Sequence, residues 1–482
     1  MTAPLKKPRK GDLFEVRITG LTARGEGEAD HGRFTLAVPG ALPGERVEVE
    51  VTQIKKRIAS ARVVSLLEAS PHRIEPRCQH FAHCGGCTLQ TLSHAAQLQT
   101  KVDLIRGLLM AQSLDPNLVQ DPIALETPWF YRNKMEFSFG RLPSGWVGVG
   151  LHPPGFRYEV FDLQECLLQS PEAAAIARLS GAWAREQGLM RYQNDRADGF
   201  LRTVTVREGK RTGARLIELT TSHAETTHGN AGEVSARAVA DSFVAMLLAA
   251  DVPVTSVYWS QYHAERGVPT TTREHHLHGE ELLSEALHLE GQTPLRFEIH
   301  PRAFFQPNTL GAELLYDHVA RAAGLNGEQQ VLDLYCGTGS IGMSLARHAA
   351  SVIGIELVPD AVENARQNAL RNGINNITFH AGDVAKVLER EGIQSADVIV
   401  VDPPRSGLMA AARVLVGAIP AQRLVYVSCN PASLARDLVS LHHAGWRTQS
   451  IQPFDMFPHT AHIENIAILT RPSAEDPGKS AS

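Results

Sequence analysis

The sequence predicts a multidomain chain with a small N-terminal β-barrel, a central α+β domain that holds a metal site, and a C-terminal α/β domain of the Rossmann type. Three observations support this fold class. Short alternating runs divided by glycine and proline fill residues 4–66, four cysteines fall in the first third of the chain, and a strand pattern enters a G-x-G-x-x-G turn at 331–342. We therefore expect domains at 4–66, 70–295 and 296–472, and a disordered tail at 473–482.

The composition is that of a globular protein. The chain has 482 residues, 43% hydrophobic and 21% charged, which suffices for about three domains. No apolar run reaches the roughly 18 to 20 residues that span a bilayer, and no apolar stretch follows the charged start MTAPLKKPRKGD. We therefore expect a cytoplasmic protein without membrane contact, and we take it to act as a monomer.

Residues 4–66 resemble a small antiparallel β-barrel in their pattern. Apolar and polar residues alternate in four runs, at 13–18, 33–38, 46–51 and 59–66. Residues 1–66 carry 12 Lys and Arg against 8 Asp and Glu, although the whole chain has a net charge of −5. A basic barrel is suited to a polyanion such as nucleic acid, while a solvated charged face and simple packing against a neighbouring domain are the alternatives.

Four cysteines form a candidate metal site. Cys84 and Cys87 stand in C-x-x-C spacing on a glycine turn, Cys78 is close by, and Cys166 is distant in sequence. Four thiolates suit zinc or a [4Fe–4S] cluster, and the spacing leaves both open. Free buried thiols are the alternative, whereas disulfides are not expected in a cytoplasmic chain of this size.

The rest of the central domain mixes helices and strands. Helical periodicity is found at 98–109 and near 171–188, strands are expected at 129–139, 147–151, 158–161, 200–206 and 213–220, and a polar loop at 222–232. Arg132 and Lys134 lie among aromatic residues in the first of these strands. Such side chains could stack on bases and hold phosphates, or the aromatic residues could simply form core.

The C-terminal domain begins its nucleotide-binding pattern at the glycine turn. The missing side chain at Gly337 lets a ligand approach the backbone, and the next strand ends in Glu356, where a carboxylate can accept both ribose hydroxyls. These features indicate an adenosine-containing cofactor. A dinucleotide, S-adenosylmethionine and a purely structural glycine turn all remain open at this point.

Further candidate residues follow the later strands of this domain. Asp383 follows the third strand, where it is placed to accept from an adenine amino group, Asp402 follows the fourth, and Cys429 follows the fifth. In an open α/β sheet the carboxyl ends of parallel strands meet at one edge, where ligands bind. Upstream, Gln306 lies in a polar loop before a helix, and this position alone does not indicate a function.

Two residues are candidates for catalysis. Cys429 precedes a helix, so the helix N-terminus and loop amides are expected to favour its thiolate, with a buried structural cysteine as the alternative. Glu464 lies at the mouth of the last strand, where a carboxylate can accept a proton. Cys336, inside the glycine turn, is interpreted as structural.

The order of motifs resembles one known family. GLTARGEGEA and FTLAVPGALPGERVEVEV resemble the TRAM domain, an OB-like RNA-binding module. FFQPN, DLYCGTGSIG, DPPRSG, VSCNPASLARD and HTAHIENI resemble, in this order, the RNA uracil-5-methyltransferase family, which makes 5-methyluridine in tRNA or ribosomal RNA. The resemblance covers almost the whole chain; Ser340 departs from it, since many relatives carry Asn or Thr there.

The resemblance implies roles for the residues that match it. Gln306, Tyr335, Glu356 and Asp402 would contact S-adenosylmethionine, with Asp383 beside the adenine; Cys429 would be the nucleophile and Glu464 the base; Cys78, Cys84, Cys87 and Cys166 would hold a [4Fe–4S] cluster. The TRAM-like barrel favours 23S rRNA as the substrate, with tRNA as the alternative. An amino-group methyltransferase, suggested by Asp402-Pro403-Pro404, and a non-catalytic RNA-binding factor are the rival functions.

Overall fold

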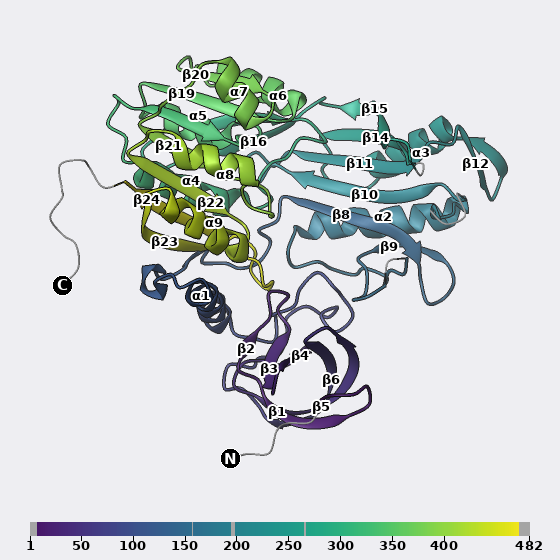
Figure 1. The fold of residues 1–482 in the computed structure, drawn as a ribbon. Coiled ribbons are helices and arrows are strands. Elements are labelled where there is room, and N and C mark those ends of the chain that lie inside the picture. Colours follow the sequence, from purple (N-terminus) through teal and green to yellow (C-terminus); the bar gives the residue numbers. More distant parts are fainter. Residues whose placement is uncertain (1–6, 157, 194–197, 265–266, 472–482) are drawn as a thin grey trace.

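A computed structural model describes residues 7–156, 158–193, 198–264 and 267–471 (Figure 1). The tail predicted at 473–482 lies outside them. Figure 1 shows a barrel at the bottom, a sheet at the upper left formed by the C-terminal part of the chain, and a second sheet at the right. None of the helices in the described ranges combines the length and apolar character needed to cross a membrane.

The N-terminal part is a six-stranded barrel. Its strands are β1 (Leu13–Arg17), β2 (Gly20–Leu21), β3 (Gly27–His31), β4 (Phe34–Val38), β5 (Arg46–Lys55) and β6 (Ile58–Glu68), in the order β1-β5-β6-β4-β3-β2. Val47, Val49 and Val51 alternate inward along β5 and are fully buried. The predicted runs omit β2 and β3, because glycines and charged residues interrupt the alternation there.

The central part is a six-stranded sheet with helices on one face (Figure 1). It contains β8 (Lys134–Arg141), β9 (Val147–Gly150), β10 (Leu201–Glu208), β11 (Arg215–Ser222), β14 (Ser256–His263) and β15 (Thr271–Gly279), with α2 (Pro171–Gln187) and α3 (Ala236–Ala249). The polar loop predicted at 222–232 contains much of a hairpin, β12 (Thr226–Gly229) with β13 (Gly232–Ser235). The strand predicted at 158–161 makes only an isolated bridge, between Arg141 and Glu159.

The C-terminal part is an eight-stranded sheet in the order β20-β19-β18-β21-β22-β24-β23-β7. Its strands are β18 (Gln330–Leu334), β19 (Ser351–Glu356), β20 (Ile377–Ala381), β21 (Val398–Val401), β22 (Arg423–Ser428), β23 (Arg447–Asp455) and β24 (Glu464–Thr470), and its helices α4 (Thr309–Ala323), α5 (Ser340–Ala346), α6 (Pro359–Arg371), α7 (Val384–Arg390), α8 (Ala410–Ala418) and α9 (Pro431–His443). Since β24 runs antiparallel to β22, its N-terminal end joins the carboxyl ends of the parallel strands at one edge.

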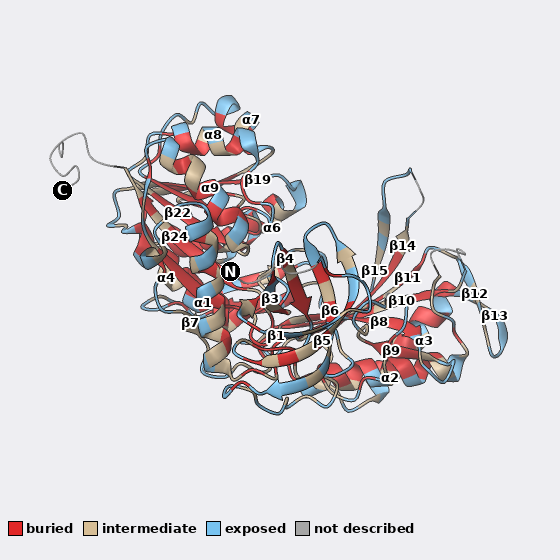
Figure 2. Cartoon of the chain, turned by 60° about the horizontal axis from the view of Figure 1, so that its bottom comes forward, coloured by how far each residue is buried: buried red, intermediate tan, exposed pale blue. Residues whose placement is uncertain are grey.

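Segments from earlier in the sequence complete this eight-stranded sheet. The helix α1 (His94–Ala111) packs Val102, Ile105 and Leu109 into the core on the face covered by α8 and α9. After the short turn η1 (Pro116–Leu118), β7 (Ile123–Ala124) joins the sheet edge, and the hairpin of β16 (Leu283–Leu287) and β17 (Leu295–Ile299) packs on the opposite face. Figure 2 shows buried residues along both large sheets and the inner faces of their helices.

Candidate active site and cysteine cluster

The glycine turn after β18 leaves open backbone at one position. Gly337 and Gly339 both have positive φ, +54° and +76°. A Cβ on Gly339 would lie 2.6 Å from the Phe379 ring, whereas nothing lies within 4 Å of a Cβ placed on Gly337. Gly339 is therefore needed for packing, and Gly337 leaves space beside the backbone. The Ser340 side chain bonds to a neighbouring helix, since its Oγ lies 2.8 Å from the Tyr316 hydroxyl of α4.

Glu356 is fixed at this turn by two backbone amides. Its Oε2 accepts from the Gly337 N–H at 3.1 Å, and its Oε1 accepts from the Val358 N–H at 3.0 Å. The carboxylate thus stands at the mouth of the turn, where it can accept hydroxyl groups of a ribose. Asp383 lies at the end of the next strand, exposed, with its Oδ1 capping α7 through the Ala385 N–H at 3.1 Å.

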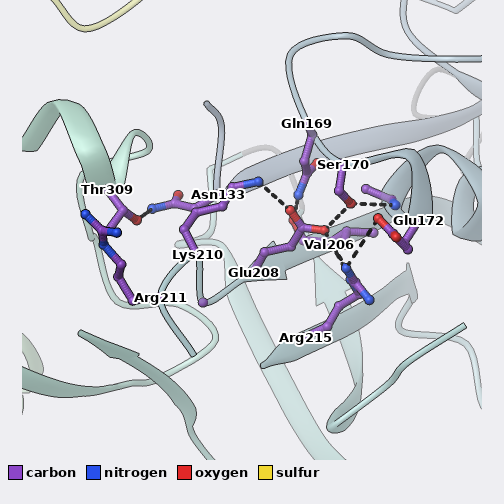
Figure 3. Close-up of polar contacts among 12 residues, drawn as sticks. Asn133, Gln169, Ser170, Glu172, Val206, Glu208, Lys210, Arg211, Arg215 and Thr309 are labelled. Carbon is purple, nitrogen blue, oxygen red and sulfur yellow. Dashed lines mark hydrogen bonds and ion pairs between the residues drawn. The ribbon is translucent and has the colours of Figure 1, made fainter. Parts of the chain in front are cut away.

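The loop that carries Gln306 is held by the central sheet. Asn133 donates from its side chain to the Gln306 carbonyl at 2.8 Å and to the Thr309 hydroxyl at 2.9 Å, the latter bond being drawn in Figure 3. Arg207 donates to the Ala303 carbonyl at 2.8 Å. Asn133 was not predicted; its signal in the sequence was its place among the cations and aromatic residues before β8.

A buried charge network anchors this junction (Figure 3). Glu208, at the end of β10, is 2.7 Å from the Lys210 ammonium and 3.1 Å from the Arg215 guanidinium, and its N–H donates to the Asn133 carbonyl at 2.8 Å. Breaking a buried pair of this kind leaves an uncompensated charge and costs about 3–5 kcal/mol. The network therefore keeps Asn133, and through it the Gln306 loop, in a fixed position.

Cys429, Glu464 and Asp402 meet at one edge of the eight-stranded C-terminal sheet, called the catalytic sheet below. Strand register places Ser428 opposite Asn465, and the Asn465 side chain donates to the Ser428 carbonyl at 3.3 Å. One step further along the same strand pair, Cys429 lies beside Glu464, which is 5% exposed. Asp402 follows the neighbouring strand β21, and its charge acts on both.

Burial and mutual repulsion raise the pKa values of these groups. Burial raises the pKa of Glu464 to about 8, with a further contribution from Asp402, and burial raises the pKa of Asp402 to about 7. Burial, then Glu464 and Asp402, raise the pKa of Cys429 to about 12, while Arg405 lowers it. A carboxyl group with a pKa near 8 is suited to exchanging protons at neutral pH.

At the N-terminus of α9 the Cys429 thiol is under opposing influences: burial, then Glu464 and Asp402, raise its pKa, whereas Arg405 and a backbone N–H lower it, the direction expected for this position. The Asn430 side chain caps that helix, accepting from the Ala432 N–H at 3.1 Å. One N-terminal amide of the helix is thereby satisfied, and burial with the two carboxylates outweighs the contributions that lower the pKa of the thiol.

Asp333 is a buried acid that the sequence reasoning did not single out, although an aspartate inside an apolar strand is a visible signal. Burial, with smaller contributions from Asp402 and Glu356, raises its pKa to about 8. A pKa raised on folding contributes stability below the unfolded pKa, near 4, and this stability is lost as the pH rises through 8.

Asp333→Asn removes that ionisation cost. We expect the variant to melt higher than the wild type at pH 9, by about 5 °C, and the gain to shrink towards pH 5. Thermal denaturation monitored by circular dichroism from pH 5 to 9 measures this difference. A gain of equal size at all pH values, or a loss at pH 9, would contradict the assignment of a raised pKa to Asp333.

All four predicted metal-binding cysteines line one cavity. Gln90 lines it as well, and its side chain accepts from the Cys78 N–H at 3.1 Å. Burial raises the pKa of Cys84 to about 11 and that of Cys87 to about 12. In the described ranges no group of three or more His, Cys, Asp or Glu side chains is arranged to hold a metal ion as the chain stands.

Comparisons with known proteins agree with this architecture. Residues 268–472 match the model of the tRNA (uracil-5-)-methyltransferase family, and residues 8–64 match the TRAM domain. An RNA methyltransferase of Halalkalibacterium halodurans is 36% identical over 95% of this chain and 97% of its own length, and one of Protochlamydia amoebophila is 38% identical over 91% of this chain and all of its own. The predicted TRAM barrel and C-terminal methyltransferase fold are thereby confirmed.

A solved structure extends the match to the whole fold. The tRNA (uracil-54, C5)-methyltransferase of Pyrococcus abyssi, in complex with S-adenosyl-L-homocysteine, superposes with a TM-score of 0.70 at 26% identity, over 95% of this chain and all of that one. The open backbone at Gly337 and the fixed carboxylate of Glu356 fit the nucleoside part of S-adenosylmethionine. The chain belongs to the RNA uracil-5-methyltransferase family and is an S-adenosylmethionine-dependent enzyme that acts on RNA.

Proposed function

We propose that the chain methylates C5 of a uridine in 23S rRNA through a covalent bond between Cys429 and C6 of the uracil. The observation that carries this proposal is the pairing of β22 with β24, which sets the Cys429 thiol beside the Glu464 carboxyl group at the sheet edge that also carries Glu356. A nucleophile and a separate proton acceptor are the two groups that this reaction needs.

The proposed chemistry divides one difficult step into easier ones. C5 of uracil is a poor nucleophile, but once the Cys429 thiol has lost its proton to solvent, addition of the thiolate to C6 converts the ring into an enolate whose C5 can take up a methyl group. S-adenosylmethionine supplies that group as an electrophile. Glu464 then accepts the C5 proton, the S–C6 bond breaks, and the thiolate leaves. Arg405 is a cation that lowers the pKa of the thiol, so it favours the reactive form.

We assign the cofactor side of the site residue by residue. Gly337 gives backbone access, Glu356 accepts the ribose hydroxyls, and Asp383 lies beside the adenine through the carboxylate oxygen that does not cap α7. Gln306, Tyr335 and Asp402 complete the contacts. Tyr335 supports this assignment, since it holds a positive φ of +64°, a strained conformation that clusters at functional sites.

The RNA substrate has two candidates. The TRAM domain at 8–64 supports 23S rRNA, whereas the Pyrococcus abyssi relative, which acts on uracil 54 of tRNA, supports tRNA. Because C6 is hidden in a stacked helix, either RNA must present the uridine in a loop or flip it out. Methyl transfer from labelled S-adenosylmethionine to 23S rRNA fragments and to tRNA transcripts distinguishes them, and methylation of tRNA alone would overturn the rRNA assignment.

We also propose that Cys78, Cys84, Cys87 and Cys166 hold a [4Fe–4S] cluster. The shared cavity supports it, as does the donor set, because four cysteine thiolates are the usual ligands of such a cluster. The cluster would bind the four side chains as thiolates. They would therefore lose the protons that a raised pKa favours in the free thiols. A cluster held there would tether the segment around Cys166 to the loop around Cys84, and no step of the methyl transfer is routed through it.

We expect protein purified without oxygen to be brown, with broad absorbance near roughly 400 nm and about four iron atoms per chain. Cys84→Ser should lose most of the iron, whereas Cys336→Ser, which changes a buried cysteine outside the cavity, should retain it. Iron analysis and visible spectra measure both. A colourless protein with one zinc ion per chain would contradict the cluster.

A further inference from the structure

The loop that leads into Glu464 is held almost entirely by other parts of the chain. We call residues 456–463, between β23 and β24, the catalytic loop, and residues 78–90 the cysteine loop. Four consecutive carbonyl groups of the catalytic loop, at 456–459, accept hydrogen bonds from outside it. The donors are the Asn308 side chain at 3.0 Å, the Lys101 ammonium at 3.3 Å, the Tyr131 hydroxyl at 3.2 Å, and the Thr88 and Leu89 N–H groups at 3.0 Å each.

His459 is the point where the two loops meet. Its carbonyl accepts from both Thr88 and Leu89, the two residues that follow Cys87. Its φ is +66°, a conformation that non-glycine residues adopt only when their surroundings fix it. Its ring stacks on Trp129 with 3.8 Å between centroids, and it is 3% exposed.

Gln97 of α1 ties both loops together with one side chain. Its amide nitrogen donates to the Leu89 carbonyl at 3.0 Å and to the Leu92 carbonyl at 2.8 Å, and its oxygen accepts from the His459 N–H at 2.9 Å. The side chain is 1% exposed, so no solvent replaces these bonds if they are lost. Figure 1 shows α1 between the barrel and the catalytic sheet.

The same helix fixes the start of the catalytic loop. The Lys101 ammonium lies 2.6 Å from Asp455, the last residue of β23, and both side chains are almost fully buried. His94 lies 2.9 Å from the other oxygen of Asp455. The catalytic loop is therefore clamped at its first residues by α1 and in its middle by Gln97 and the cysteine loop, and Glu464 follows directly.

We infer that Gln97 is a positioning residue through which the cysteine loop holds the catalytic base Glu464 in place. This inference rests on the proposed function, since it assigns the cysteine site a part in the proton-removal step of that reaction. The cysteine site then has a structural role in the reaction. An ordered cysteine loop holds the Thr88 and Leu89 N–H groups in place, and their hydrogen bonds hold His459. His459 in turn holds the backbone that leads into β24.

Gln97→Met keeps the volume of the side chain and removes its four hydrogen bonds, the fourth being the contact of its Nε2 with the His459 Nδ1 at 3.2 Å. The matched control is Gln99→Met on the same helix, where the side chain is exposed and bonds only to Asp103, at 2.9 Å. We expect kcat of Gln97→Met to fall roughly a hundredfold, as for a misplaced catalytic group. Because proton removal follows methyl transfer, the methylated protein–RNA adduct should accumulate, while Kd for RNA and for S-adenosylmethionine should stay within about twofold.

Two results would overturn the inference in a folded Gln97→Met protein: an unchanged kcat, or weaker RNA binding without adduct accumulation. If the variant does not fold, hydrogen–deuterium exchange on the wild type tests the same coupling between the two loops. Removal of iron should speed deuterium uptake at 456–463 and leave β1 and β5 of the barrel unchanged. Equal uptake at 456–463 with and without iron would overturn the coupling. If the wild type forms no adduct at all, the proposed chemistry fails while the exchange result still stands.

Discussion

Cys429→Ala should abolish methylation of uridine in RNA, with a loss of about four orders of magnitude or more. Without the sulfur, C6 has no nucleophile and C5 stays unreactive, so neither methyl transfer nor a covalent protein–RNA species can form. The alanine fits the site, since the thiol is only partly buried and its Sγ holds none of the strand pairing between β22 and β24. Methyl incorporation and denaturing gels of enzyme with RNA measure both losses.

Cofactor binding provides the control for this variant. Glu356 ends β19 and Gly337 lies in the turn after β18, away from β22, so Cys429→Ala should bind S-adenosylmethionine with unchanged Kd. The same variant separates the rival functions: an amino-group methyltransferase that uses Asp402-Pro403-Pro404 needs no cysteine and would remain active. If wild type and variant both bind RNA, but neither binds S-adenosylmethionine nor forms a covalent adduct, the chain is instead the non-catalytic RNA-binding factor.

Glu464→Gln should stop the reaction after methyl transfer. The amide cannot accept the C5 proton, so the methylated adduct should persist, and turnover should fall by about 10² to 10⁴. The change replaces a carboxyl group that burial keeps largely protonated at neutral pH, so the variant should fold as the wild type does. Mass spectrometry of the RNA-linked protein detects the trapped species, and rapid turnover without it would contradict the role.

The pH dependence of the wild type follows from the raised pKa of Glu464. A general base must be deprotonated, and its pKa is about 8, so the rate at which the methylated adduct loses its C5 proton should rise about tenfold per pH unit up to pH 8 and then level off. The remaining activity of Glu464→Gln should lack this rise. An activity that falls between pH 6 and 8 would show that a protonated group is needed instead.

Much of the sheet edge could be predicted from the sequence because each residue there ends an apolar run. Glu356, Asp402 and Cys429 follow buried strands, and parallel strands bring such positions together whatever lies between them. The raised pKa of Cys429 could not be predicted, since it depends on the depth of burial and on two carboxylates from other strands.

Contacts between distant segments were outside the reach of the sequence patterns. Gln97 and His459 are 362 positions apart, and neither lies in a run that indicates a partner. Likewise, the periodicity near 98–109 predicts a helix but not that α1 packs on the catalytic sheet. The periodicity of a helix or strand predicts which of its faces is buried. Which other helix or sheet packs against that face depends on the tertiary fold.

The most direct test of the account compares loss of tritium from C5-labelled uridine with methyl incorporation in the same RNA, using wild type and Cys429→Ala. The proposed mechanism predicts one tritium released for each methyl group added by the wild type, and neither by the variant. Methyl incorporation without tritium release would place the methyl group elsewhere than C5, and release of tritium by Cys429→Ala would contradict the covalent mechanism.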